Sequence, residues 1–438
     1  MNNDPPDTLG RVRALYDAAR YLDAWEVGNA LGSLREWPGS AGRVLASRLA
    51  ARVGALRLSD ALTYRAWRGD PGDPSAAWYY AGLMLRRRGA WHALAWFRRV
   101  LPGVRERTAD LVAFEGRCLA LLRDFERAHA ALDEARQLAP DSAWILCEEA
   151  ALLEREDRVD DALAVCDDAL ARHADFPPLV QFRAHLLMER GCAEEALAQL
   201  DAAPNTAQGF ETLARRADVA FNLGRFERCA EDFAAARAIA TRFGDAGLRA
   251  RLAASEGEAL YLLRRHRDAE RVLRDGAQPQ LVAFAAALGA LRDGEAPARV
   301  LLTEVPHIRQ DHVTCAPASV AQVLAFHGDP VDHLALARTV CYAGTPTHRL
   351  RAWLEARGHV VREFVLDLDT ARALIDRRLP FVLSTASAGA SHAQVVVGYD
   401  LVRRTLLIRD PGVASLVEMS TEALFASHAW CGPRATVV

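Results

Sequence analysis

Residues 114–140 read FEGRCLALLRDFERAHAALDEARQLAP, and the pattern in this stretch decides the fold of most of the chain. Its apolar residues recur every three or four positions, which is typical of amphipathic helices. The pattern returns with a fixed period of 34 residues, at Leu85, Leu119, Leu153, Leu187 and Phe221. Small residues keep the same period, at Ala128, Ala162, Ala196 and Ala230. A fixed period of this length predicts stacked helical units.

The stretch resembles the tetratricopeptide repeat, in which two antiparallel helices form one unit and small residues lie where the helices touch. Gly116 and Ala128 occupy those small positions, and Pro140 closes the unit. The resemblance implies about six repeats between residues 75 and 276. We expect two earlier helical pairs, at residues 8–34 and 41–67. A last pair, at residues 280–292 and 296–302, is expected to end an array that fills residues 1–300.

Such arrays present an extended concave surface, which commonly holds a peptide or a protein. We therefore expect a peptide or protein partner on this surface. The alternative is a scaffold that only spaces or dimerises the C-terminal domain. Tryptophans and arginines between residues 78 and 99 have the composition of a nucleic-acid site. At repeat spacing, however, the aromatic residues favour packing between helices, and we expect no nucleic-acid partner.

The formal net charge of the 438-residue chain is −3, which argues against a global basic field that would attract nucleic acid. Residues 1–10 are polar and acidic and contain no apolar stretch typical of a signal peptide. No apolar run approaches the roughly 20 residues of a membrane span. The eight cysteines include no CxxC pair and suggest neither a disulfide framework nor a zinc cluster. These features predict a cytoplasmic protein with reduced thiols and no membrane partner.

The pattern changes at Val305-Pro306, and residues 303–438 are predicted to form a separate domain. Helices are expected over residues 316–327, 332–340, 347–357 and 369–378. Strands are expected over residues 360–366, 380–385, 392–399, 405–409 and 415–419. Helices that precede a mostly antiparallel sheet predict an α+β fold.

Cys315 lies where a loop gives way to the first of these helices, and Pro317 fits the first helical turn. A thiol at a helix N-terminus meets the positive end of the helix dipole and unpaired amide donors, which favour the nucleophilic thiolate. A single cysteine in this position is more commonly a small buried residue. A catalytic role for Cys315 therefore depends on partners elsewhere in the domain.

Two later residues can complete a cysteine-based active site. His392 opens one predicted strand and Asp410 closes the next, with residue 401 midway between them. Residues equidistant from a hairpin turn face each other, with Cβ atoms about 5 Å apart. We therefore expect Asp410 to orient the His392 ring, whose other nitrogen takes the proton of the Cys315 thiol. Gln310 is expected to donate its side-chain amide to the oxyanion, with the Cys315 backbone N–H as second donor.

Each of these residues has an ordinary structural explanation on its own, and their combination favours catalysis. Three motifs resemble those of the C39-type cysteine peptidases, the papain-like domains of bacteriocin-processing exporters and their stand-alone relatives. They are Gln310…Thr314-Cys315-Ala316-Pro317-Ala318-Ser319, Ser391-His392…Gly398-Tyr399-Asp400 and Asp410-Pro411. The resemblance implies a nucleophile, a general base and acid, an orienting carboxylate and an oxyanion donor, in the order Cys315, His392, Asp410 and Gln310.

The sequence departs from the family pattern at two positions. Ala316 stands where the family usually has glycine, and Ala393 stands where it has an aromatic residue. Neither change removes a reacting group, but both alter the wall of the cleft. Exporter members also carry a membrane transporter and cleave after a double-glycine leader. No transporter segment is recognised in this sequence, so that specificity is not carried over.

The predicted architecture is an α-solenoid of tetratricopeptide-like helix pairs followed by an α+β papain-like cysteine peptidase domain, in a bacterial protein. The predicted function is cleavage of a peptide or protein substrate that the repeats recruit, without a cofactor. Two alternatives stay open: a thiol-dependent acyl transferase with the same site, and a repeat adaptor carrying an inactive peptidase-like module. A metal site made of His307, Asp311, His312 and Cys315 is disfavoured, because these residues do not match the usual zinc spacings.

Overall fold

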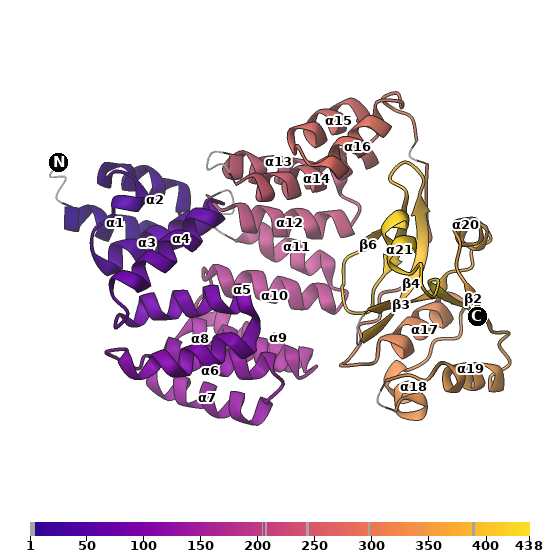
Figure 1. Cartoon of the computed structure of the whole chain (residues 1–438), viewed down its shortest axis with the longest axis horizontal. Coiled ribbons are helices and arrows are strands. Elements are labelled where there is room, and N and C mark those ends of the chain that lie inside the picture. The colour runs from indigo at the N-terminus through magenta and orange to yellow at the C-terminus, as the bar shows by residue number, and fades with distance from the viewer. Residues whose placement is uncertain are drawn as a thin grey trace. The chain divides into compact units, whose positions relative to one another are not determined.

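A computed structural model describes the protein over residues 5–203, 205, 208–241, 245–296, 298–342, 344–387 and 390–438 (Figure 1). The chain forms two compact units. The first comprises Met1–Leu187, Ala193–Ala259 and Asp275–Gln278, and the second comprises Met188–Cys192, Leu260–Arg274 and Pro279–Val438.

The first unit is built from successive helices that pack in pairs along the chain (Figure 1). These helices are α1 (Pro5–Asp17), α2 (Tyr21–Gly28), α3 (Gly39–Arg52), α4 (Leu56–Gly69), α5 (Pro74–Val100), α6 (Ala109–Leu121), α7 (Phe125–Leu138), α8 (Ala143–Arg155), α9 (Val159–Arg172), α10 (Pro177–Glu189), α11 (Ala193–Ala202), α12 (Phe210–Asn222), α13 (Phe226–Thr241) and α14 (Ala246–Leu262). Short 3-10 turns lie at Asn29–Leu31, Leu34–Glu36 and Leu101–Gly103. The predicted solenoid of helix pairs is confirmed, including the two early pairs α1/α2 and α3/α4.

The turn within each repeat contains a residue with left-handed backbone, and these residues keep the period of the sequence. Gly89, Arg123, Asp157 and Gly191 are 34 residues apart and have φ angles between 60° and 80°. Gly89 breaks α5, so this segment supplies both helices of one repeat. A left-handed residue ends a helix and lets the chain reverse. The period is therefore present in the backbone as well as in the apolar residues.

Gly116 shows why small residues lie between the two helices of a repeat. A Cβ atom at Gly116 would be 3.2 Å from the carbonyl oxygen of Ala128 and 3.3 Å from Cγ of Leu132. Gly116 on α6 and Ala128 on α7 are both buried. The two helix backbones can approach this closely only because neither residue carries a bulky side chain.

The second unit contains one antiparallel sheet together with the helices around it. Its strands are β1 (Arg299–Leu301), β2 (Arg362–Val365), β3 (Phe381–Ser387), β4 (Ala390–Asp400), β5 (Thr405–Arg409), β6 (Val417–Ser420) and β7 (Arg434–Val437). Among the described residues the strand order is β2-β7-β3-β4-β5-β6, and β1 also pairs with β4. The helices are α15 (His266–Asp275), α16 (Pro279–Leu288), α17 (Cys315–Phe326), α18 (His333–Val340), α19 (Thr347–Ala356), α20 (Leu368–Asp376) and α21 (Thr421–Ser427). This confirms the predicted α+β arrangement.

Helix α17 packs on β4 and β3, as Figure 1 shows. Its Val320, Val323 and Leu324 are fully buried in the same core as Val395 and Val396 of β4. The apolar face of the helix therefore fixes the position of its N-terminus against the central strands. In the described parts of the chain, no helix has the length and apolar character needed to cross a membrane.

The predicted helix over residues 296–302 is wrong, because residues 299–301 form β1 antiparallel to β4. Val300 pairs with Tyr399, and Leu301 pairs with Gly398. Glycine is required at position 398, since a Cβ atom there would lie 2.2 Å from the carbonyl oxygen of Val300. Pairing with a distant strand thus overrides the local pattern of a short apolar segment.

Helices α15 and α16 belong by their contacts to the unit that contains the sheet. The Tyr261 hydroxyl donates a hydrogen bond to Oδ1 of Asp400 at 3.3 Å. The Arg403 guanidinium lies over the Phe284 ring, 5.0 Å from its centroid. The domain boundary at residues 300–303 stays a prediction, and the compact unit around the sheet takes in helices that precede it.

Candidate active site

Cys315 is the first residue of α17 and follows a tight turn. The Thr314 backbone N–H and hydroxyl both donate to the Asp311 carbonyl oxygen, at 3.1 and 2.9 Å. Val313 in this turn has a φ of 57°, although its side chain is β-branched and 58% exposed. That conformation costs roughly 1–2 kcal/mol. The turn therefore carries backbone strain two residues before a half-buried thiol at the positive end of a helix.

His392 lies on β4, where it pairs with Thr385 of β3. Its ring is hydrogen-bonded to the Cys315 thiol. Its Nε2 atom donates to Oδ2 of Asp410 at 2.8 Å, which leaves Nδ1 for the thiol. The structure thus brings three of the four predicted site residues into one hydrogen-bonded chain.

The register by which His392 and Asp410 meet differs from the predicted one. Val395 pairs with Arg409, and a bulge between Val396 and Gly398 shifts the hairpin. His392 and Asp410 are therefore not directly opposite, because the register places position 410 opposite position 394. They are diagonal neighbours on one face, a spacing that long side chains can bridge. The facing-pair prediction was wrong in register, since a bulge in β4 cannot be read from the spacing alone.

A buried hydroxyl ties α17 to the strand that carries His392. Ser319 is fully buried, and its Oγ donates to the carbonyl oxygen of Ala393 at 3.0 Å. The Ala393 backbone N–H in turn donates to the Cys315 sulfur. Position 393, which departs from the family pattern, therefore contributes through its backbone. No role was assigned to Ser319 from the sequence. Its position one helical turn after Cys315 was the only sequence feature that could have suggested one.

The pKa values of the thiol and the imidazole move in opposite directions. Hydrogen bonds to Asp410 and to Cys315 raise the pKa of His392 to about 10, against the effect of burial. Burial raises the pKa of the Cys315 thiol, but hydrogen bonds from His392 and from the Ala393 and Ala316 amides lower it below its ordinary value. Each charged group stabilises the other. These shifts favour the imidazolium form of His392 and make the thiolate of Cys315 easier to form beside it.

Asp410 is held by two hydrogen bonds to its carboxylate and one to its backbone carbonyl oxygen. Burial raises its pKa, but hydrogen bonds from His392 and from the Gly412 N–H, the latter at 2.7 Å, lower it overall. On the backbone side, Nε2 of His307 donates to the Asp410 carbonyl oxygen at 3.2 Å. Burial and the nearby Arg409 lower the pKa of His307 to about 4, so its ring is neutral at neutral pH. His307 thus holds the backbone of Asp410. From the sequence, His307 was considered only as a possible metal ligand.

Gln310 lies beside the turn that carries Asp410. Its backbone N–H donates to the Pro411 carbonyl oxygen at 2.8 Å, and its side-chain amide lies against Gly412. The Oε1 atom is buried without a hydrogen-bond partner among the described residues. No contact of the described residues joins the Gln310 side chain to Cys315. Its role as an oxyanion donor therefore stays a prediction.

The other cysteines have different environments. Burial raises the pKa of Cys118 and Cys166 to about 12 and raises those of Cys147 and Cys229 as well. Only Cys315 has a lowered pKa among the cysteines whose pKa is shifted. Within the described ranges, no three or more His, Cys, Asp or Glu side chains are grouped so that they could hold a metal ion.

Residues 302–430 match the model of the Peptidase_C39 like family. The C-terminal domain is C39-like. The match includes Cys315, His392 and Asp410, and it leaves the helix pairs of the array outside. No curated protein matches the chain.

Solved structures of repeat proteins are similar to the helical part. The structure of the APC/C hetero-tetramer Cut9-Hcn1 matches with 11% identity and a TM-score of 0.41, over 64% of this chain and 54% of that one. Yeast Tom70 matches with 16% identity and a TM-score of 0.41, over 64% of this chain and 59% of that one. A tetratricopeptide repeat protein of Thermus thermophilus matches with 20% identity and a TM-score of 0.35, over 42% of this chain and 98% of that one. The chain thus spans little more than half of the first two.

Proposed function

We propose that the C39-like domain is a cysteine peptidase that cleaves a peptide or protein substrate recruited by the repeat array. Cys315 acts as nucleophile, His392 as general base and acid, Asp410 as orienting carboxylate and Gln310 as oxyanion donor. The observation that carries the proposal is the hydrogen-bonded chain from thiol through imidazole to carboxylate. The eight cysteines are free thiols, which supports a reducing compartment such as the cytoplasm.

In the first half of the reaction, the Cys315 thiolate attacks the carbonyl carbon of a peptide bond. The oxyanion that forms accepts hydrogen bonds from the Cys315 backbone N–H and the Gln310 amide. The His392 imidazolium gives its proton to the leaving nitrogen as the C–N bond breaks, and a thioester remains. Asp410 keeps the ring in place and stabilises its charged form.

In the second half, neutral His392 takes a proton from water while the water oxygen attacks the thioester carbon. The C–S bond breaks, the carboxylic acid product leaves, and the thiolate–imidazolium pair is restored. If an amine replaces water in this step, the same residues transfer an acyl group. Product analysis with and without an added amine distinguishes the two outcomes.

Alkylation by iodoacetamide tests the reactive pair without a known substrate. We expect Cys315 to react faster than the exposed Cys192 at about pH 6, because its hydrogen bonds lower the pKa of the Cys315 thiol. His392→Ala should remove this advantage, and mass spectrometry assigns the labelled residue. If Cys315 reacts no faster than Cys192, the domain is better described as an inactive module. Peptides trapped on a Cys315→Ala variant would identify the substrate.

A further inference from the structure

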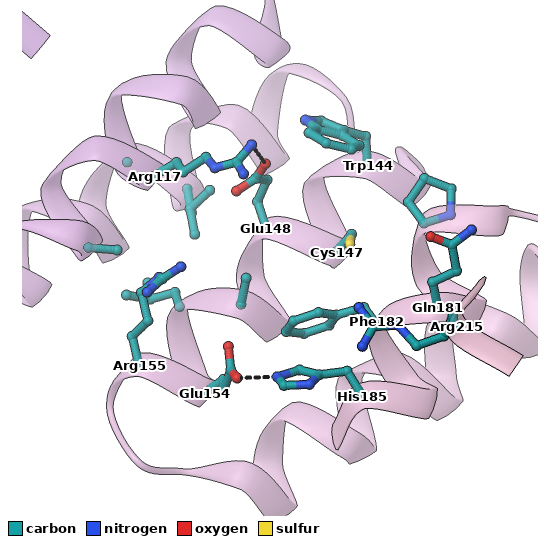
Figure 2. A pocket seen from close by; sticks show the side chains of 16 residues that line it. Arg117, Trp144, Cys147, Glu148, Glu154, Arg155, Gln181, Phe182, His185 and Arg215 are labelled. Carbon is teal, nitrogen blue, oxygen red and sulfur yellow. Dashed lines mark hydrogen bonds and ion pairs between the residues drawn. The ribbon is translucent and has the colours of Figure 1, made fainter. Parts of the chain in front are cut away.

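The first unit contains a pocket of about 440 Å³ that lies far along the chain from the active-site residues. Helices α6, α8, α10 and α12 each contribute to its lining, so it crosses the first helices of four successive repeats. Figure 2 shows Phe182 and Cys147 in the middle of the pocket, with Arg117 and Arg155 toward one side and Gln181 and Arg215 toward the other.

The charged groups of the pocket do not cancel. Three arginines and two glutamates line it. One glutamate, Glu148, pairs with Arg117 at 3.4 Å, and the other, Glu154, accepts a hydrogen bond from His185 at 2.7 Å. Arg155 and Arg215 have no salt bridge among the described residues, although Arg155 acts on the buried Glu148 and Arg215 on the buried Asp218. Their guanidinium groups can therefore still donate hydrogen bonds to an anionic ligand.

The Glu148 carboxyl is almost completely buried beside two of the arginines. Burial raises the pKa of Glu148, while Arg117 and Arg155 act in the opposite direction. Its side chain is 8% exposed, so a ligand in the pocket meets the arginines more directly than this carboxyl. Arg155 or Arg215 can donate two parallel hydrogen bonds to a carboxylate of the ligand.

The rest of the lining favours an apolar side chain. Phe182 and Trp144 are half-buried aromatic residues of α10 and α8. The Trp144 ring is braced by an edge contact with Trp78, with the ring centroids 5.3 Å apart. Aromatic rings of this kind supply a large contact area for a ligand side chain. A small inorganic anion would leave this surface unused.

The four helices also indicate the length of the ligand. Packed helices lie about 9 Å apart, so four of them span roughly 27 Å. An extended peptide rises about 3.3 Å per residue, which gives about eight residues across the array. The pocket itself accommodates only the central side chains of such a segment.

We propose that this pocket binds an extended acidic peptide segment that carries a large apolar or aromatic side chain next to its carboxylates. The carboxylates pair with Arg155 and Arg215, and the apolar side chain lies on Phe182 and Trp144. This inference rests on the proposed function in one respect: the acidic segment would belong to the substrate that the repeats recruit. Glu148 and Glu154 disfavour a polyphosphate backbone, which would bring several fixed negative charges beside them.

The test uses the full chain with Cys315→Ser, so that binding is measured without turnover. The probes are fluorescein-labelled octapeptides whose four central positions vary over Glu, Gln, Lys, Leu, Phe and Ala, read by fluorescence anisotropy. We expect octapeptides that combine Glu with Leu or Phe to bind at least about tenfold more tightly than the same peptides with Gln in place of Glu. Their binding should weaken as the salt concentration rises. The double variant Arg155→Gln/Arg215→Gln should lose at least about tenfold of that affinity, the change worth ~1.4 kcal/mol.

Two further variants complete the design. Arg251→Gln changes an exposed arginine of the same array without an ion pair among the described residues, and it should leave binding unchanged. Phe182→Ala should weaken the binding only of those octapeptides that contain Leu or Phe. Equal unfolding temperatures of all variants would show that the array remains folded.

Several results would overturn the proposal. These are no preference for Glu over Gln, unchanged binding by the double arginine variant, equal loss in Arg251→Gln, or tighter binding of a thymidine octanucleotide. Competition by free phosphate as effective as by unlabelled peptide would reduce the pocket to a general anion site. Iodoacetamide labelling of Cys315 is measured separately, so failure of the pocket proposal and failure of the peptidase proposal can be told apart.

Discussion

Replacing Asp410 with asparagine tests how far the thiolate–imidazolium pair depends on the third residue of the site. The hydrogen bond to Asp410 is the largest influence that raises the pKa of His392 from an ordinary 6.5 to about 10. Cys315 shares in this rise, and the His392 side chain is 36% exposed, so water screens part of the effect. After both allowances, we expect Asp410→Asn to lower the pKa of His392 by about one unit, or ~1.4 kcal/mol.

A less stable imidazolium stabilises the thiolate less, so the acid limb of the Cys315 alkylation curve should move to higher pH. Its rate at about pH 6 should fall roughly tenfold. The assay measures iodoacetamide labelling of each cysteine by mass spectrometry between about pH 4 and pH 9. The exposed Cys192 is an internal control whose curve should not move.

Asp410→Ala is the companion variant, and it should shift the curve further because the hydrogen bond to Nε2 is lost together with the charge. An acid limb that is the same in the wild type and both variants would refute the reasoning. It would mean that Asp410 does not control the charge of His392, whatever the distance between them.

Four other changes have defined outcomes. Gln310→Ala should lower kcat by roughly 100-fold once a substrate is known, without moving the Cys315 alkylation curve; an unchanged kcat would remove Gln310 from the oxyanion site. Ser319→Ala, which leaves a buried carbonyl without its donor, should cost about 1 kcal/mol of unfolding free energy in urea titrations. Gly398→Ala should destabilise the sheet unit by roughly 1–3 kcal/mol, since its Cβ would collide with the backbone of β1, and an unchanged urea midpoint would contradict this. His392 has a raised pKa, so its contribution to stability is complete below about pH 6.5 and is lost as pH rises through about 10; the difference in unfolding free energy between wild type and His392→Gln should shrink over that range.

Most of the fold could be predicted because its signals are local. The 34-residue period placed the helix pairs from α5 to α13, helical patterns outside the strict period placed the pairs before and after them, and the apolar run after Cys315 placed α17. The missed strands β1 and β7 depend on distant partners, and the short helix α21 was missed as well. Each of these strands has four residues or fewer, and β7 pairs with both β2 and β3. A segment that short contains too little periodicity to identify a strand.

The candidate site shows the same division. Cys315 begins a helix and Asp410 follows the end of a strand, and His392 was expected to open its strand, although β4 begins two residues earlier. The hydrogen bonds of His307 and Ser319 to backbone carbonyls could not be found, since a side chain that holds a distant main-chain atom leaves no pattern in its own neighbourhood. The four-helix pocket was equally hidden, because its lining residues come from separate repeats.

The buried carboxylate of Asp400 has a consequence for how this protein can be divided or recombined. Only 1% of the residue is exposed, and its neighbours come from three segments: the Tyr261 hydroxyl at 3.3 Å, the Arg299 guanidinium at 3.8 Å and the Arg403 backbone N–H at 2.9 Å. A fragment that starts at residue 303 would lose the first two of these contacts, together with strand β1, whose Arg299 pairs with Asp400. A C39-like domain grafted onto another carrier would therefore have to bring the final repeat helices with it. The compact unit around the sheet takes in residues Leu260–Arg274, which the sequence places in the repeat array.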